Sequence, residues 1–134
     1  MTVPDETRPV TQRHQEAVRG YYRAIDGDDY ELLASVLAAD VTHIRPDMTL
    51  DGRERFIEFM RDERPQNETS HQIDALYRQT DSGGVAAQGR LIAADGTLIT
   101  HFVDVFSFND AEIAQIRTFT ASRARRCRRR YGSR

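Results

Sequence analysis

The chain has 134 residues, 39% of them hydrophobic, which is enough for one domain with a single core. All 19 basic residues are Arg and seven of them lie in 122–134, so residues 1–120 carry 12 Arg against 21 acidic residues. The acidic body argues against a nucleic-acid-binding domain, no apolar run has the length of a membrane span, and the single Cys127 excludes an internal disulfide.

The two ends of the chain differ from its middle. Residues 1–10 contain two prolines without periodicity and predict a flexible arm, whereas residues 11–120 predict the folded domain. Residues 121–134 are basic, have no apolar face and predict a disordered tail, which in isolation could bind nucleic acid or a membrane surface. The polar, acidic start does not fit a secretory signal, so we expect a soluble cytoplasmic protein.

Three helices are predicted before residue 65. The first begins at Thr11 and stops at Gly27, the second spans about Tyr30–Leu37, and the third spans Arg53–Arg64. Apolar residues at spacings of three and four define the buried face of the first helix: Ala17, Val18, Tyr21, Tyr22 and Ile25. On the same helix, His14 is expected to be exposed to solvent.

Strands follow the second and third helices. Val41–Arg45 reads as a short strand ended by Pro46, with Met48–Leu50 as its hairpin return. Turn residues then separate four longer strands, Thr69–Gln79, Val85–Ala94, Leu98–Phe108 and Glu112–Thr120. In the first of these, alternation places His71, Ile73, Ala75 and Tyr77 on one face. Helices followed by an antiparallel meander predict an α+β fold with the helices on one face of a sheet.

One carboxylate on the strand Leu98–Phe108 needs an explanation. Alternation puts Asp104 in a row with three phenylalanines, at positions 102, 106 and 108. A charge in such a row must be paired, protonated or used in function. The opposite face carries Ile99, His101, Val103 and Val105. Because this outer face is also apolar, we expect it to meet a second copy of the chain in a homodimer.

The order of elements resembles the nuclear transport factor 2-like superfamily, and within it the SnoaL-like polyketide cyclase group, a relative of ketosteroid isomerase. The resemblance covers residues 14–120. It is carried by four segments: Tyr21–Asp28, Leu37–Val41, Leu50–Glu54, and Phe102–Phe106 leading to Ile113. It implies a cone-shaped fold in which a curved antiparallel sheet is joined by three N-terminal helices. The homodimer expected from the apolar outer face would then form through the convex face of that sheet.

The resemblance to ketosteroid isomerase extends to part of its catalytic site. Tyr21, five residues before Asp26, matches the tyrosine of the oxyanion hole, and Asp104 matches its protonated acid. The isomerase has an aspartate base directly before a proline on the first strand, whereas Arg45 precedes Pro46 here. Steroid isomerisation with that base is therefore not expected.

Two interpretations of the polar residues remain open. In the first, His43 is the general acid or base of a small-molecule pocket, Arg45 binds an anionic or carbonyl oxygen, and Tyr21 and Asp104 complete the polar wall. The other pocket residues would then be Phe56, Phe59, Met60, His71, Phe102, Phe106 and Ile116. In the second, Arg45 and Asp104 form a buried ion pair and His43 is a satisfied interior histidine.

The sequence thus predicts binding of a small, mostly apolar molecule, with acid–base chemistry of the isomerase, dehydratase or cyclase type as one possibility. The alternative is a non-catalytic ligand-binding or dimerisation module with a buried polar network. No cofactor is expected. The histidines lack the spacing of a metal site, so no metal is expected either.

Overall fold

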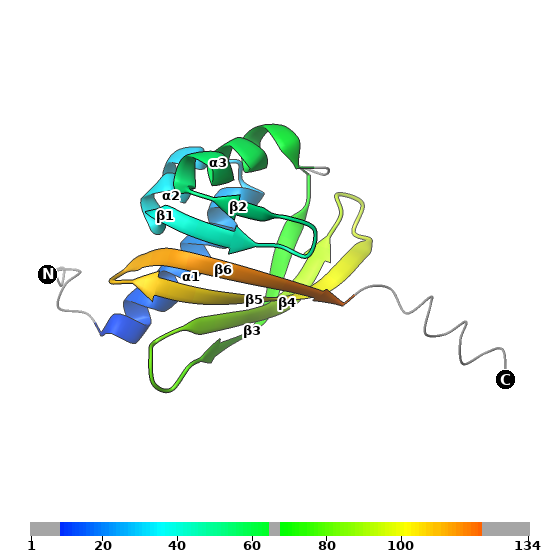
Figure 1. Cartoon of the computed structure of the whole chain (residues 1–134). Coiled ribbons are helices and arrows are strands. Elements are labelled where there is room, and N and C mark those ends of the chain that lie inside the picture. The colour runs from blue at the N-terminus through cyan, green and yellow to red at the C-terminus, as the bar shows by residue number, and fades with distance from the viewer. Residues whose placement is uncertain (1–8, 65–67, 122–134) are drawn as a thin grey trace, which may run out of the picture.

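A computed structural model describes residues 9–64 and 68–121; residues 1–8 of the predicted arm, Cys127 and the basic tail lie outside this part. The helices are α1 (Val10–Asp26), α2 (Tyr30–Val36) and α3 (Arg53–Glu58), which continues as a π-helix, η2 (Phe59–Glu63). The strands are β1 (Leu37–Ile44), β2 (Thr49–Asp51), β3 (Ser70–Arg78), β4 (Val85–Ile92), β5 (Leu98–Asn109) and β6 (Glu112–Ala121). This order, drawn in Figure 1, confirms the predicted α+β class.

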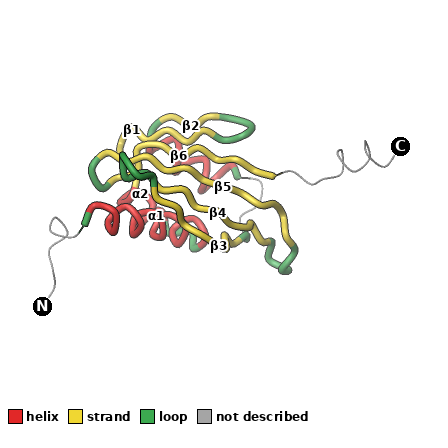
Figure 2. Tube along the Cα trace, turned by 90° about the horizontal axis from the view of Figure 1, so that it is seen from below, coloured by secondary structure: helices red, strands yellow, loops and turns green. Residues whose placement is uncertain are grey.

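The six strands form one curved, unclosed sheet in the order β2-β1-β6-β5-β4-β3. Strands β3 to β6 make the predicted antiparallel meander, and β1 and β2 form the predicted hairpin. Strand β1 pairs with β6 in parallel, a long-range pairing that the local sequence pattern does not reveal. The helices lie on one side of the sheet (Figure 2) and leave its opposite face uncovered.

The side of the sheet that faces the helices carries most of the core. The predicted apolar stripe of α1 is buried, including Val18, Tyr21, Tyr22 and Ile25. From the sheet, the largest fully buried partners are Phe106, Ile113 and Ile116. Apolar side chains fill the half of the concave face near the β3–β4 and β5–β6 turns, and Tyr21 and Ile25 lie further along α1.

A register shift in β3 corrects one prediction. The pairing of β3 with β4 is interrupted between Ile73 and Ala75, so the simple alternation does not continue beyond that point. Leu76 therefore packs against the core, whereas Tyr77, predicted to face inward, is 56% exposed. The shift lies beside Gly89, where a Cβ atom would be only 2.3 Å from the Gln72 carbonyl oxygen.

His14 is buried, which overturns the expectation that it is exposed to solvent. Its Nδ1 lies 2.8 Å from the carbonyl oxygen of Gly83 and its Nε2 lies 2.8 Å from that of Asp110. The ring also stacks on Phe108 with centroids 3.8 Å apart. Because Gly83 and Asp110 belong to the β3–β4 and β5–β6 turns, this one side chain ties α1 to both turns.

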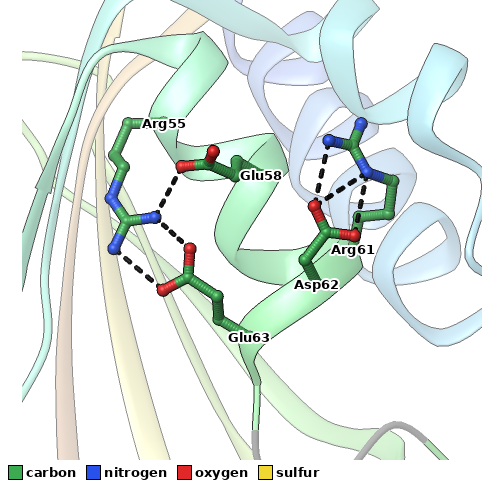
Figure 3. A network of polar contacts seen from close by, with 5 residues as sticks. All are labelled: Arg55, Glu58, Arg61, Asp62 and Glu63. Atoms are coloured by element: carbon green, nitrogen blue, oxygen red, sulfur yellow. Dashed lines mark hydrogen bonds and ion pairs between the residues drawn. The ribbon is translucent and has the colours of Figure 1, made fainter.

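The end of the third helix is held by surface charges. Arg55 donates hydrogen bonds to Glu58 and Glu63, and Arg61 donates to Asp62, as Figure 3 shows. The Arg55–Glu63 pair spans the π-helical turn, and exposed pairs of this kind contribute little to stability individually. Their acceptors and donors satisfy one another on the surface.

Replacing His14 with Ala is expected to lower the free energy of unfolding by about 2–4 kcal/mol, because the Gly83 and Asp110 carbonyl groups lose the imidazole that contacts both and Phe108 loses its stacked ring. Urea unfolding measures the change. The control is Arg19→Ala on the exposed face of the same helix, which should alter stability by less than about 0.5 kcal/mol. Equal effects of the two variants would show that the His14 contacts contribute nothing specific.

Candidate functional site

A cavity of about 430 Å³ occupies the other half of the concave face, between the sheet, α1, η2 and the β1–β2 turn. Its ionisable lining residues come from α1, from strands β1, β3 and β5, from the β1–β2 turn and from the residue after η2: Tyr21, His43, Arg45, Asp47, Arg64, His71 and Asp104. Its apolar lining includes Ile25, Met60, Leu91, Ile99 and Phe102. The volume falls in the range of small-molecule sites.

The change from core to cavity follows the inner face of β6. Ile113 and Ile116 are fully buried, whereas Thr118 and Thr120, further along the same face, line the cavity. Shorter, hydroxyl-bearing side chains fill less of the space under the helices than isoleucines do. The strand sequence itself therefore marks where packing ends and the cavity begins.

The predicted apolar lining is only partly present. Met60, His71 and Phe102 line the cavity as predicted. Four other predicted lining residues do not border it, because they are packed in the core beside it: Phe56, Phe59, Phe106 and Ile116. The ring of Phe59 still affects the site, since the Arg45 guanidinium lies 4.8 Å from its centroid.

Asp104 is 5% exposed and receives two hydrogen bonds. The Tyr22 hydroxyl donates to Oδ2 at 2.5 Å, and the Thr118 hydroxyl donates to Oδ1 at 2.6 Å. Burial raises the pKa of the Asp104 carboxyl above its ordinary value, and the two hydrogen bonds oppose that rise. Asp104 is thus an acid that burial shifts toward its protonated form.

The proposed ion pair between Arg45 and Asp104 is not formed. Among the described residues, the nearest carboxylate to Arg45 is that of Asp47, whose Oδ1 lies 3.6 Å from Nε. Asp104 has hydroxyl partners instead. The two side chains border the same cavity, but the sequence could not show that strand β6 would supply Thr118 beside Asp104.

Tyr22, rather than Tyr21, donates to Asp104. Both tyrosines lie on the buried face of α1, with their rings 5.1 Å apart at an angle of 67°. Burial and the nearby Asp104 charge raise the pKa of both phenols. No hydrogen bond joins the Tyr21 hydroxyl to another described residue, and Tyr21 lines the cavity. Tyr21 therefore remains a candidate ligand donor.

His43 extends the hydrogen-bonded chain from Asp104. Its Nε2 lies 2.8 Å from the Thr118 hydroxyl oxygen; because Thr118 donates its proton to Asp104, Nε2–H is the donor to Thr118. Nδ1 is buried and has no hydrogen-bond partner among the described residues. Burial, followed by the charge of Arg45, lowers the pKa of His43 to about 3. This setting fits a neutral interior histidine better than a general base.

His71 lies on the opposite wall and has a carboxylate partner. Its Nδ1–H donates to Asp26 Oδ1 at 2.7 Å, and its backbone N–H donates to Asp26 Oδ2 at 2.8 Å. The ring lies between Tyr22 and Phe102, at 5.3 Å from each, and borders the cavity. The carboxylate thus fixes the proton on Nδ1 and leaves the Nε2 lone pair without a partner among the described residues.

Asp26 is the site residue that sequence reasoning missed. Its position at the C-terminal end of α1 suggested a turn residue, and only its spacing from Tyr21 gave it a place in the resemblance. Its contact with His71 joins residues 45 positions apart. No local pattern encodes a contact of this kind.

The described residues include no group of three or more His, Cys, Asp or Glu side chains arranged to hold a metal ion. None of the helices in residues 9–64 and 68–121 has the length and apolarity required to cross a membrane.

The curved sheet with three helices on its concave face defines an α+β protein of the cystatin-like and NTF2-like class. The chain belongs to the SnoaL-like domain family, which matches residues 18–116, so the predicted resemblance is confirmed. No curated protein sequence matches it.

Several solved structures share the fold. A candidate ketosteroid isomerase from Kribbella flavida DSM 17836 has 18% identity and a TM-score of 0.72, covering 84% of this chain and 80% of its own. A protein of unknown function with a cystatin-like fold from Methylobium petroleophilum PM1 has 17% identity and a TM-score of 0.73, covering 84% and 78%. An LEH-like epoxide hydrolase from M. tuberculosis has 17% identity and a TM-score of 0.71, covering 84% and 86%. At these identities the likeness establishes the fold.

The lowered pKa of His43 can be tested by NMR titration. Its imidazole signals should stay those of the neutral ring from about pH 8 to pH 5, because the lowered pKa is about 3. Since the unfolded chain takes up a proton near pH 6.5, the His43 contribution to stability is present above that pH and is lost as pH falls toward 3. Titration of His43 near 6.5 in the folded protein would contradict this assignment.

Proposed function

We propose that the chain binds a small, mostly apolar organic molecule in this cavity and catalyses proton transfer on it, with His71 as the general base. The observation that carries the proposal is the His71–Asp26 pair at the cavity wall. Asp26 orients the ring, and the free Nε2 is the atom available to take a proton from a bound molecule. The reaction would be an isomerisation, a dehydration or a cyclisation.

The cavity also holds polar groups that can stabilise the negative charge created when a proton is abstracted. Removal of a proton next to a carbonyl group places negative charge on the carbonyl oxygen, and a positioned donor stabilises that charge. The Tyr21 hydroxyl is available for this role, while Asp104 and Tyr22 support the wall behind it. His43 would contribute a neutral polar surface rather than a base.

One observation favours a second function, that of a non-catalytic ligand-binding module. The chain from Tyr22 through Asp104 and Thr118 to His43 is closed within the protein, as a structural network would be. The catalytic proposal therefore depends on His71 and not on this network, and an experiment can separate the two.

The test is deuterium uptake from D₂O into a panel of cyclic ketones and keto acids, followed by mass spectrometry. For a ketone that exchanges, His71→Ala should slow exchange roughly 10²- to 10⁴-fold, the usual contribution of a general base. Asp26→Asn should also slow it, because the ring loses its orienting acceptor. Added imidazole should partly restore the rate in His71→Ala, which a structural role would not explain.

Arg19→Ala, on the exposed face of α1, is the control and should exchange at the wild-type rate. If panel ketones bind in the cavity but show no enzyme-dependent exchange, or if exchange ignores His71→Ala, the protein is a binding module.

We also propose that the chain forms a homodimer through the uncovered face of the sheet. Large apolar side chains are exposed there on β3, β5 and β6, with Tyr77, Val105 and Phe119 all solvent-accessible in the single chain. The register places Phe119 directly beside Val103 and Tyr77 beside Ala86, so the apolar residues continue across the sheet. Exposed patches of this kind mark association surfaces.

Phe119→Glu is expected to convert the dimer into a monomer, because it would place two unpaired charges in the interface. Light scattering after gel filtration measures the mass. Val10→Glu replaces another exposed apolar residue, on α1 away from this face, and should leave the dimer intact. A wild-type mass of 15.3 kDa would refute the dimer.

A further inference from the structure

We propose that the ligand of the cavity carries a carboxylate, and that Arg45 holds this group at the β1–β2 end of the cavity. This deepens the proposed function, on which it rests for the presence of a ligand. It adds a substrate class, an organic acid with an apolar body, to a site that is otherwise defined only by its size and by His71.

Arg45 has hydrogen-bonding capacity that the described residues leave unused. It lines the cavity, its side chain is 24% exposed, and its buried Nε–H has no hydrogen-bond partner among the described residues. The Asp47 carboxylate, at 3.6 Å from Nε, is beyond hydrogen-bond distance. The guanidinium is therefore a cation at the cavity whose carboxylate neighbour among the described residues, the exposed Asp47, forms an ion pair but no hydrogen bond with it.

The orientation of the Arg45 guanidinium is restricted by the ring of Phe59. The guanidinium lies over the Phe59 ring, and Phe59 is itself packed in the core. Stacking on a fixed ring restricts the positions that a long, flexible side chain can adopt. Arg45 is thus partly preorganised, which reduces the entropy lost when it binds an anion.

The positive charge of Arg45 acts on the cavity wall where the other polar residues lie. Burial raises the pKa of Tyr21 and of Asp104, and the positive charge of Arg45 opposes that rise in both. Arg64, the other guanidinium of the cavity, is different because one of its terminal nitrogens already donates to the Ile25 carbonyl and to Asp28. Both cations have a buried Nε without a hydrogen-bond partner among the described residues, but the terminal nitrogens of Arg45, unlike Nη2 of Arg64, make no hydrogen bond to a described residue.

Arg45 and His71 lie on different parts of the sheet. Arg45 directly follows β1, and His71 lies on β3, at the far edge of the sheet. In the strand order, β6, β5 and β4 lie between β1 and β3, and Met60, Phe102 and Thr118 are among the residues that line the cavity. A guanidinium matches the two oxygens of a carboxylate. An acid anchored there would extend its apolar body toward His71.

The test compares naphthoate with its uncharged counterpart, naphthamide, by isothermal titration calorimetry. The wild type should bind naphthoate roughly tenfold or more tightly than naphthamide. In Arg45→Gln, naphthoate binding should weaken roughly 10- to 100-fold while naphthamide binding stays the same, as expected for one charge-assisted hydrogen-bonded contact. Asp47→Asn should tighten naphthoate binding roughly twofold to fivefold, because it removes a competing carboxylate.

Arg117→Gln is the matched control. Arg117 pairs in register with Ile44, next to Arg45 along β1, but its side chain is exposed on the outer face, so the variant removes the same charge outside the cavity. It should leave naphthoate binding unchanged.

The inference is overturned if the wild type binds naphthoate no more tightly than naphthamide, or if Arg45→Gln and Arg117→Gln weaken it equally. Failure of the catalytic proposal is a separate result: proton exchange would then ignore His71→Ala, while the wild type would still prefer naphthoate to naphthamide.

Discussion

The buried carboxyl of Asp104 is the group on which the geometry of the site depends. An unpartnered polar group at this depth would cost several kcal/mol, on the order of 2–7 depending on the reference state. Its two hydroxyl donors come from α1 and β6, and Thr118 also accepts from His43 on β1. One chain of hydrogen bonds therefore joins the first helix to three strands of the sheet. Because the chain fixes the rotation of α1 about its axis, it also determines where Tyr21 and Asp26 point.

The concave face has two halves with different physical requirements. At the end near the β3–β4 and β5–β6 turns, apolar side chains fill the space between helix and sheet, and His14 holds both turns against α1. At the other end, threonines replace isoleucines on β6 and a cavity remains. The packed half stabilises the fold, and that stability permits the other half to remain open. The end with the cavity can therefore lack core packing, because the packed end stabilises the fold.

Much of this arrangement follows from the sequence, because periodicity and turn residues are local. They predict the three helices, the meander and the need of Asp104 for partners. The partners themselves are not local. The choice of Tyr22 over Tyr21 depends on helix rotation, the role of Thr118 on the β5–β6 register, and the inward Leu76 on a register shift in β3. The pairing of His71 with Asp26 depends on where β3 passes the end of α1. The sequence therefore indicates which residues are unusual better than it indicates their contacts.

The contrast between the two cavity histidines follows from their partners. His43 donates to a hydroxyl whose own proton is committed to Asp104, and its other nitrogen is buried, so a bound molecule has little access to it. His71 is anchored through one nitrogen to a carboxylate and borders the cavity, which leaves the second nitrogen for a ligand. Polar atoms already satisfied within the protein maintain the site, whereas those without an internal partner are free to act on a ligand. By this criterion, His71 Nε2, the Tyr21 hydroxyl and the Arg45 guanidinium are the three groups from which a function must be built.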